Sequence, residues 1–213
     1  MRKGTFSIAL GLALLFCALA LTVYNVSDAH RAGQSAALAA AQLDAALPPQ
    51  DERVPALPHA PQTGELPPEA ELPDYLLDPT RDMPVTQLDG VGYVGVLSIP
   101  AISLELPVIE CWDEALAKLA PCRYVGSAYQ SGFVIAGHNY RRHFGALKEL
   151  GEGDSVTFTD MDGNVFSYAV SQVEVLAPTA IEEMTGGDWP LTLFTCTLGG
   201  RSRVTVRCID AAQ

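Results

Sequence analysis

The sequence is poor in basic residues and in cysteine. Thirteen Lys and Arg stand against 25 Asp and Glu, a formal net charge of −12 over 213 residues. A protein that binds nucleic acid through phosphate contacts needs the opposite balance, so we expect no nucleic acid among the partners. There are five cysteines and no Cys-x-x-Cys pair. This excludes a disulfide-framework miniprotein and gives no sign of a zinc site or a redox pair.

The N-terminal segment is typical of a membrane anchor. Arg2 and Lys3 precede an uncharged stretch, and the next charged residue is Asp28. Residues 5–24 have about the 20-residue length that crosses a bilayer core as a helix. Basic residues before such a span hold the N-terminus in the cytoplasm. We therefore expect 1–27 to be a cytoplasmic start and transmembrane signal anchor, with the remainder extracellular. The alternative is a cleaved signal peptide, whose apolar region is normally shorter.

Residues 28–90 differ in composition from everything after them. They contain ten of the fifteen prolines, and 11 acidic against 3 basic residues. Such sequence buries too little apolar surface to offset the entropy of ordering. We expect an Ala-rich part that favours a helix at the membrane surface, then a Pro-rich acidic stalk that is extended over 48–84. The alternative is that part of this stretch folds back over the domain as a lid.

From residue 91 to 213 the pattern indicates one β-rich domain. Short apolar runs typical of strands occur at 94–99, 104–109, 131–137, 155–159, 165–175, 191–196 and 203–209. A turn signal, Asp-Gly-Asn at 162–164, indicates a hairpin. Two short helices are expected over 113–120 and 142–150. Seven or so short strands in about 120 residues favour a closed β-barrel or a sandwich.

Two residues at strand ends are candidates for catalysis. His138 follows the apolar run 133–136 through Gly137. Histidine is the usual acid–base residue near neutral pH, although a single His is more often structural. Cys196 ends the run 191–196. A lone Cys in an apolar strand is usually an inert core residue, but arginines close by would favour its reactive thiolate.

The last expected strand carries those arginines. Alternation gives Val204, Val206 and Cys208 one face, which we expect inside the barrel, and Arg203 and Arg207 the other face. Two interpretations of the Arg face are open. It lies across a groove toward the candidate cysteine, or it is a solvated strand face, since exposed Arg is common.

Together these residues resemble the sortase family, the cysteine transpeptidases of Gram-positive bacterial surfaces. Residues 192–196 (Thr-Leu-Phe-Thr-Cys) are similar to the family's Thr-Leu-x-Thr-Cys signature, and 134–139 (Val-Ile-Ala-Gly-His-Asn) to the strand end with the catalytic His. Residues 203–206 (Arg-Val-Thr-Val) resemble the strand that begins with the essential Arg. The resemblance covers roughly 91–210. It implies a mainly β protein, a closed sortase-like β-barrel of seven to eight strands with two short helices, preceded by a transmembrane helix.

The resemblance also implies the chemistry. Cys196 is expected to attack an LPxTG-like sorting motif of secreted proteins, with His138 as general acid and then base. Arg203 is expected to stabilise the oxyanion or hold the substrate backbone. The thioacyl intermediate passes to a cell-wall precursor or other amine acceptor, without metal or organic cofactor. Thr195 and Trp189 are expected to bind substrate.

Two features depart from the family pattern. Only residues 197–202 separate the cysteine from Arg203, which is a short connection, and Arg201 within it is a second candidate for the Arg role. The lid of pilus-building members often contains Asp-Pro-aromatic, and the nearest approach here is Asp78-Pro79-Thr80. We therefore do not expect the lid-bearing pilus type.

Two other functions stay open at this point. One is an exported thiol protease that uses the same intermediate. The other is a non-catalytic, membrane-tethered β-domain, which predicts a Cys196–Cys208 disulfide and a distant His138. Cys111 and Cys122 flank the first expected helix and could pair outside the cell.

Overall fold

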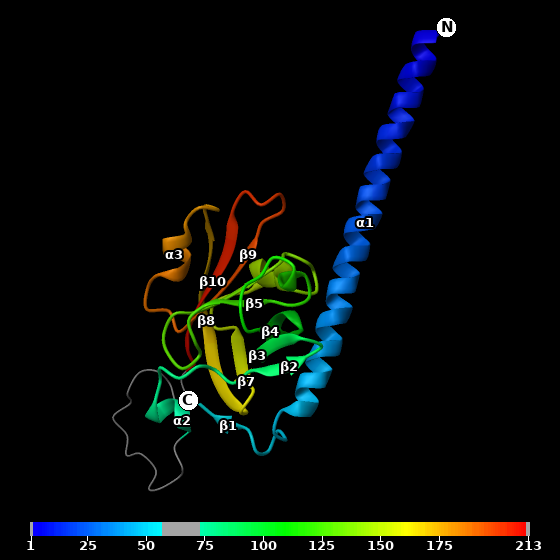
Figure 1. Cartoon of the computed structure of the whole chain (residues 1–213). Helices are drawn as coiled ribbons and strands as arrows, with labels where there is room; N and C mark the ends of the chain where they lie inside the picture. The colour runs from blue at the N-terminus through cyan, green and yellow to red at the C-terminus, as the bar shows by residue number, and fades with distance from the viewer. Residues whose placement is uncertain (1, 57–72, 212–213) are drawn as a thin grey trace.

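The computed structural model describes residues 2–56 and 73–211 and consists of a β-barrel from which one long helix projects (Figure 1). The helix is α1 (Arg2–Ala46). The strands of the barrel are β3 (Val91–Ile99), β4 (Leu104–Ile109), β5 (Cys122–Val125), β6 (Phe133–Gly137), β7 (Ser155–Asp160), β8 (Asn164–Leu176), β9 (Leu191–Cys196) and β10 (Arg203–Asp210). The short elements are β1 (Val54–Pro55), β2 (Thr86–Leu88), α2 (Asp74–Leu77), α3 (Ile181–Thr185) and the 3₁₀ turns η1 (Pro100–Ile102), η2 (Leu116–Lys118) and η3 (Phe144–Glu149).

Strand pairing closes the sheet on itself. The order is β8-β10-β9-β6-β5-β4-β3, and β7 pairs with both β3 and β8. The pairs β6–β9 and β4–β5 are parallel. A closed ring leaves no unpaired strand edge of the kind that invites aggregation. The closed barrel predicted from the sequence is confirmed.

The expected elements are present, with two corrections. All seven predicted strands form, with small shifts at their ends, but β5 was missed because it is short and follows Pro121 directly. The two predicted helices are only the 3₁₀ turns η2 and η3. In the second of these, Gly145 lies against the backbone of Asn139 and Tyr140. The chain is tightly turned where Gly145 lies against this backbone, and the segment forms a 3₁₀ turn instead of the predicted helix.

Apolar side chains fill the interior of the barrel. Phe133 and Phe158 pack edge to face, with ring centroids 5.0 Å apart, and both are fully buried. Val204, Val206 and Cys208 belong to the same core, so the face of β10 predicted to point inward does so. Burial of this surface is the main stabilising contribution to the fold.

The C-terminal half of α1 lies against the outside of the barrel. Ala32, Ala36, Ala40, Leu43 and Leu47 are buried. Their spacing of three to four residues gives the helix one apolar stripe, which meets β4 and β3. The helix expected after the membrane segment is therefore present, and it is docked on the domain.

The stretch expected as a stalk also contacts the barrel where the structure describes it. β1 pairs with β8, and β2 with β3. Tyr75 of α2 is buried and stacks on Tyr129 at 4.9 Å between ring centroids. The expected extended spacer over 48–84 thus contacts the barrel in both of its described parts, 48–56 and 73–84. Its residues 57–72 lie outside the described ranges. The domain boundary at residue 90 stays a prediction.

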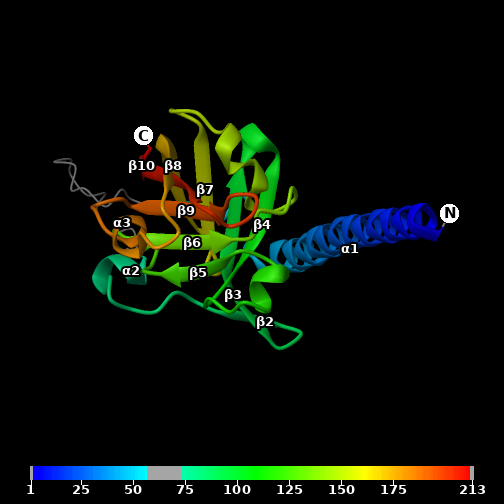
Figure 2. The ribbon, with the colours of Figure 1, turned by 90° about the horizontal axis from the view of Figure 1, so that it is seen from above.

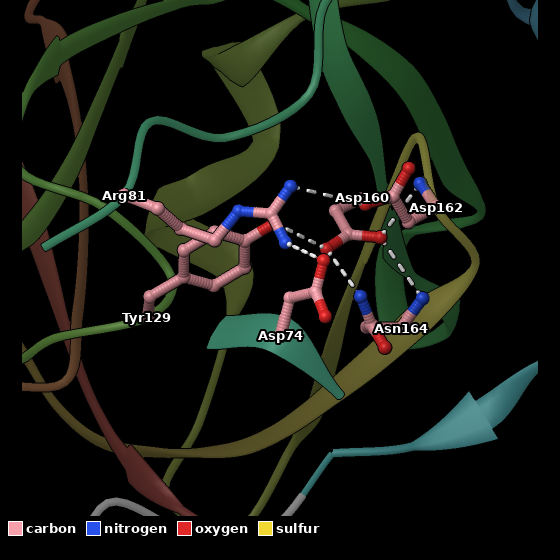
Figure 3. A network of polar contacts seen from close by, with 6 residues as sticks. All are labelled: Asp74, Arg81, Tyr129, Asp160, Asp162 and Asn164. Atoms are coloured by element: carbon pink, nitrogen blue, oxygen red, sulfur yellow. Dashed lines mark hydrogen bonds and ion pairs between the residues drawn. The ribbon is translucent and has the colours of Figure 1, made fainter. Parts of the chain in front are cut away.

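A single carboxylate organises the turn between β7 and β8. Asp160 is fully buried and accepts four hydrogen bonds (Figure 3). Its Oδ1 accepts from the backbone N–H groups of Asp162 (3.0 Å) and Asn164 (2.9 Å), and its Oδ2 from the Tyr129 hydroxyl and the Asn164 amide, both 2.8 Å. Beside it, Arg81 bonds Asp74 at 2.8 Å. We call Asp160, Tyr129 and Asn164 the Asp160 network.

Among the described residues, one helix is long and apolar enough to cross a membrane. It is α1, whose most apolar 18-residue window has a mean hydropathy of 2.5 and is entirely unburied. Large apolar side chains are exposed along it from Phe6 to Val26. By length and composition this helix is compatible with the anchor predicted from the sequence.

Candidate active site

Strand register brings the three predicted catalytic residues together. In the parallel pair β6–β9, Gly137 lies opposite Thr195, and in the antiparallel pair β9–β10, Cys196 lies opposite Arg203. The ends of β6 and β9 therefore meet the beginning of β10, and these strands lie side by side in Figure 2. His138 follows β6 directly, so all three side chains start from one edge of the sheet.

The three side chains line one hollow of about 250 Å³. It opens on the outer face of the barrel because Cys196 and Phe194 alternate with the inward-facing Leu193. The other residues around it are Trp112, Glu114, Tyr124, Gly137, Pro178, Ile181 and Met184. We call this space the first hollow. A cysteine, a histidine and an arginine in one hollow are the groups that acyl transfer through a thioester needs.

A second hollow lies on another side of the same cysteine. Its volume is about 630 Å³. Cys196 lines both spaces, and Thr195 lines this one. The charged residues here are Arg141, Lys148 and Glu149. The candidate cysteine therefore adjoins two hollows.

His138 lines the first hollow and packs against an aromatic ring. Its Nε2 is buried, with no hydrogen-bond partner among the described residues. Its imidazole lies 5.2 Å from the ring of Tyr140, measured between centroids. A buried ring nitrogen without a protein partner is free to exchange a proton with a bound substrate.

The second histidine of this loop has a structural environment. His143 is fully buried, and its ring meets that of Tyr140 edge-on at 5.5 Å. Burial lowers the pKa of His143 to about 4, so this imidazole is neutral near pH 7. A neutral buried ring contributes packing to the loop that carries His138.

Arg203, rather than Arg201, lines the first hollow. Its Nη1 donates to the carbonyl oxygens of Gly200 and Ser202, each at 3.3 Å. The short loop 197–202 closes through the Thr197 amide, which donates to the Ser202 carbonyl at 2.9 Å. The short connection noted in the sequence thus forms a tight turn, after which Arg203 lies opposite Cys196 in the sheet.

The thiol of Cys196 is partly exposed and unpaired, and the other four cysteines are unpaired too. The Cys196–Cys208 disulfide that a non-catalytic domain predicts is absent, and so is a Cys111–Cys122 pair. Burial raises the pKa of Cys122 and of Cys208 to about 12. These two are inert thiols, since the thiolate is the reactive form.

The solvated interpretation of the last strand is wrong for Arg207. This residue is buried. Its Nε bonds Glu174 at 2.7 Å, and its Nη1 donates to the Met184 carbonyl at 2.8 Å. It therefore fixes α3, whose residues Ile181 and Met184 form one wall of the first hollow.

The two predicted substrate-binding residues lie apart from each other. Thr195 is buried at the rim of the second hollow. Trp189 lines neither hollow, and the guanidinium of Arg207 lies 5.9 Å from its ring centroid. Its expected substrate contact stays a prediction. No group of metal-binding side chains occurs in the described ranges, and no residue of 73–90 lines either hollow.

Sequence reasoning missed the residues that surround this catalytic group. Trp112, Glu114 and Tyr124 form a wall of the first hollow, and Tyr140 packs on His138. The first three flank the turn η2, and they carry no periodic signal. The aromatic side chain at Tyr140, two residues after the candidate histidine, was the one local signal available.

Comparison with known proteins supports one family. The sequence profile of the sortase domain matches residues 97–212, more than half of the chain. The chain belongs to the sortase family. A curated relative, Sortase A of Bacillus anthracis, is 31% identical over 115 residues, which cover 51% of this chain and 54% of the relative. The chain thus spans about half the length of the curated relative that it matches.

Solved sortases share the same barrel. Sortase C1 of Streptococcus agalactiae is 26% identical, with a TM-score of 0.51 over 60% of this chain and 72% of that one. Sortase A of Corynebacterium diphtheriae has the same TM-score at 24% identity, over 57% of this chain and 61% of that one. Sortase-family homologues are cysteine transpeptidases. The second likeness, at this identity, concerns the fold alone.

Proposed function

We propose that this sortase is a membrane-anchored transpeptidase that cleaves an LPxTG-like sorting motif in secreted proteins. It joins the acyl part to an amine acceptor of the cell wall. The observation that carries the proposal is that His138, Cys196 and Arg203 line one hollow. Each is contributed by a different strand end, so rigid backbone sets their relative positions.

The reaction assigns one role to each side chain. The Cys196 thiolate attacks the carbonyl carbon before the scissile bond, and the carbonyl oxygen becomes an oxyanion beside Arg203. Collapse breaks the C–N bond, and His138 gives its proton to the departing amine. A thioester on Cys196 remains. His138 then takes a proton from the incoming amine, which attacks the thioester. The C–S bond breaks, and the Cys196 thiolate is released.

The two hollows give the two substrates separate approaches. The first contains the imidazole and the guanidinium together with apolar walls, which suits a peptide of the Leu-Pro type. The second is lined by the same cysteine and carries charged groups. We assign the sorting motif to the first hollow and the acceptor amine to the second.

The length and apolar composition of α1 support a position of this chemistry beside a membrane. We propose that residues 1–27 cross the bilayer with the N-terminus in the cytoplasm, so that the barrel lies outside the cell. Secreted proteins and wall precursors are both found there. The formal net charge of −12 argues against nucleic acid as a partner.

Product analysis tests the proposal. The intact chain in detergent micelles is incubated with an LPxTG peptide, with and without a short glycine peptide as the amine. We expect a ligated peptide product. We also expect the mass of the enzyme to increase by that of the acyl fragment, with the fragment attached to Cys196. Hydrolysed peptide alone, with the amine in excess, would identify a thiol protease instead.

Two variants make the result specific. Cys196→Ala removes the nucleophile, so cleavage and ligation are both expected to vanish. Cys17→Ala removes an exposed thiol of the apolar segment and is expected to leave both unchanged. Activity that survives in Cys196→Ala would refute the proposal.

A further inference from the structure

The helix that carries the apolar segment also contacts the loop of the catalytic histidine. Asp28 of α1 accepts a hydrogen bond from the Tyr140 hydroxyl at 2.7 Å. Asp28 comes two residues after Val26, where the run of exposed large apolar side chains ends. At 1.5 Å per residue, this contact is about 3 Å along the helix from that run. The edge of the anchor and the active-site loop are thus joined by one bond.

Tyr140 lies between the two histidines of the loop. Its ring centroid is 5.2 Å from that of His138 and 5.5 Å from that of His143. His143 is fully buried, so one side of the ring is fixed by packing. Asp28 fixes the hydroxyl end. The ring also lies against the imidazole of His138, which exchanges the proton in the proposed reaction.

The loop backbone transmits the same restraint. The Phe144 amide donates to the His138 carbonyl at 3.2 Å, and the amides of His143 and Gly145 donate to the Tyr140 carbonyl at 2.9 and 3.0 Å. The hydrogen bond from Tyr140 is the largest cause of a lowered pKa at Asp28. Asp28 is therefore an anionic acceptor near neutral pH, and a charge-assisted bond is stronger than a neutral one.

We propose that Asp28 and Tyr140 are positioning residues for His138, so that docking of the membrane-anchor helix sets the orientation of the imidazole in the first hollow. The inference rests on the proposed function, because it assigns His138 the proton transfers. It predicts that the anchor acts on the rate of proton transfer and leaves substrate binding unchanged. Neither residue lines either hollow.

A double-mutant cycle on the intact chain in detergent micelles tests this. Loss of one side-chain hydrogen bond corresponds to a fall of about fivefold to tenfold in kcat. We expect that fall in Asp28→Ala and in Tyr140→Phe, with KM unchanged, and no further fall when the two are combined. Asp28→Asn keeps an acceptor oxygen and is expected to retain most of the rate.

The matched control lies on the same helix. Asp44 of α1 bonds Arg53 at 2.6 Å, away from both hollows, so Asp44→Ala is expected to leave kcat unchanged. Additive losses in the double variant would overturn the proposal. So would a change confined to KM, or an equal loss in Asp44→Ala.

A readout that needs no turnover separates this inference from the proposed function. In spectra of the chain with labelled histidines, Asp28→Ala is expected to move the imidazole signals of His138, and the control Asp44→Ala is expected to leave them in place. If the unsubstituted chain ligates nothing, the proposed function fails, and the spectra still decide the positioning role. Unmoved His138 signals would refute it.

Discussion

Two polar regions of the barrel differ in whether their buried polar atoms have hydrogen-bond partners. In the Asp160 network, a fully buried carboxylate accepts four hydrogen bonds (Figure 3). At the first hollow, the Nε2 of His138 is buried with no partner in the described part of the chain. A buried polar atom without a hydrogen-bond partner costs free energy of folding. Such an atom can still form a hydrogen bond with a bound substrate. The first region therefore stabilises the fold, and in the proposed function the second carries the chemistry.

The largest expected effect separates these roles at the hollow. His138→Gln removes the acid–base group and should lower kcat by about 10²–10⁴-fold. Since Nε2 has no described partner, the free energy of unfolding should change little. Steady-state ligation and urea unfolding measure the two quantities. A variant that keeps its rate but unfolds more easily would reverse the assignment.

The opposite result is expected in the Asp160 network. Asp160→Ala leaves the Tyr129 hydroxyl and the Asn164 amide without their acceptor, and should lower the free energy of unfolding by about 3 kcal/mol. Asp162→Ala removes a half-exposed neighbour and should cost much less. Urea unfolding compares them. Equal losses of unfolding free energy in the two variants would show that the buried network stabilises the fold no more than an exposed carboxylate does.

The two regions also differ in how far the sequence predicts them. His138, Cys196 and Arg203 stand at the ends of apolar runs, so alternation and strand boundaries place them, and the structure brings all three to one hollow. The register that makes them neighbours needs the parallel β6–β9 pair. That pairing depends on chain segments far apart in sequence, and no local pattern contains it.

Docking of the N-terminal half was harder to predict. Proline content and acidic charge indicated a free stalk, yet Leu43 and Tyr75 are buried against the barrel. The Ala-rich part has apolar residues every three to four positions, which indicates a helix with one apolar face. The overall composition of the segment does not contain this spacing. The burial of Arg207 was also beyond a local pattern. Alternation places this arginine on the outer face of the strand, and α3 covers it there.

Arg207 links the site to its supporting structure, so its loss should affect substrate binding. Arg207→Met removes the bonds to Glu174 and to the Met184 carbonyl, and α3 is then free to leave the first hollow. We expect KM for the sorting peptide to rise by about tenfold, near 1.4 kcal/mol, with a smaller change in kcat. Peptide titration of the ligation rate measures this. A fall in kcat at constant KM would instead connect Arg207 to the chemical step.

The response to acid should also differ in sign between the loop that carries His138, through its buried His143, and the Asp160 network. The pKa of His143 is lowered by burial to about 4, so the unfolded chain, with a value near 6.5, binds the proton more readily. The stability that His143 contributes is present above pH 6.5 and is lost as the pH falls toward 4. Burial raises the pKa of Asp160, so its contribution changes the other way and weakens as the pH rises through its folded value. His143→Gln should therefore reduce the loss of unfolding free energy between pH 7 and pH 4 by about 2 kcal/mol, and Asp160→Asn should increase it. Urea unfolding at both pH values decides, and shifts of the same sign in the two variants would contradict the contrast between the regions.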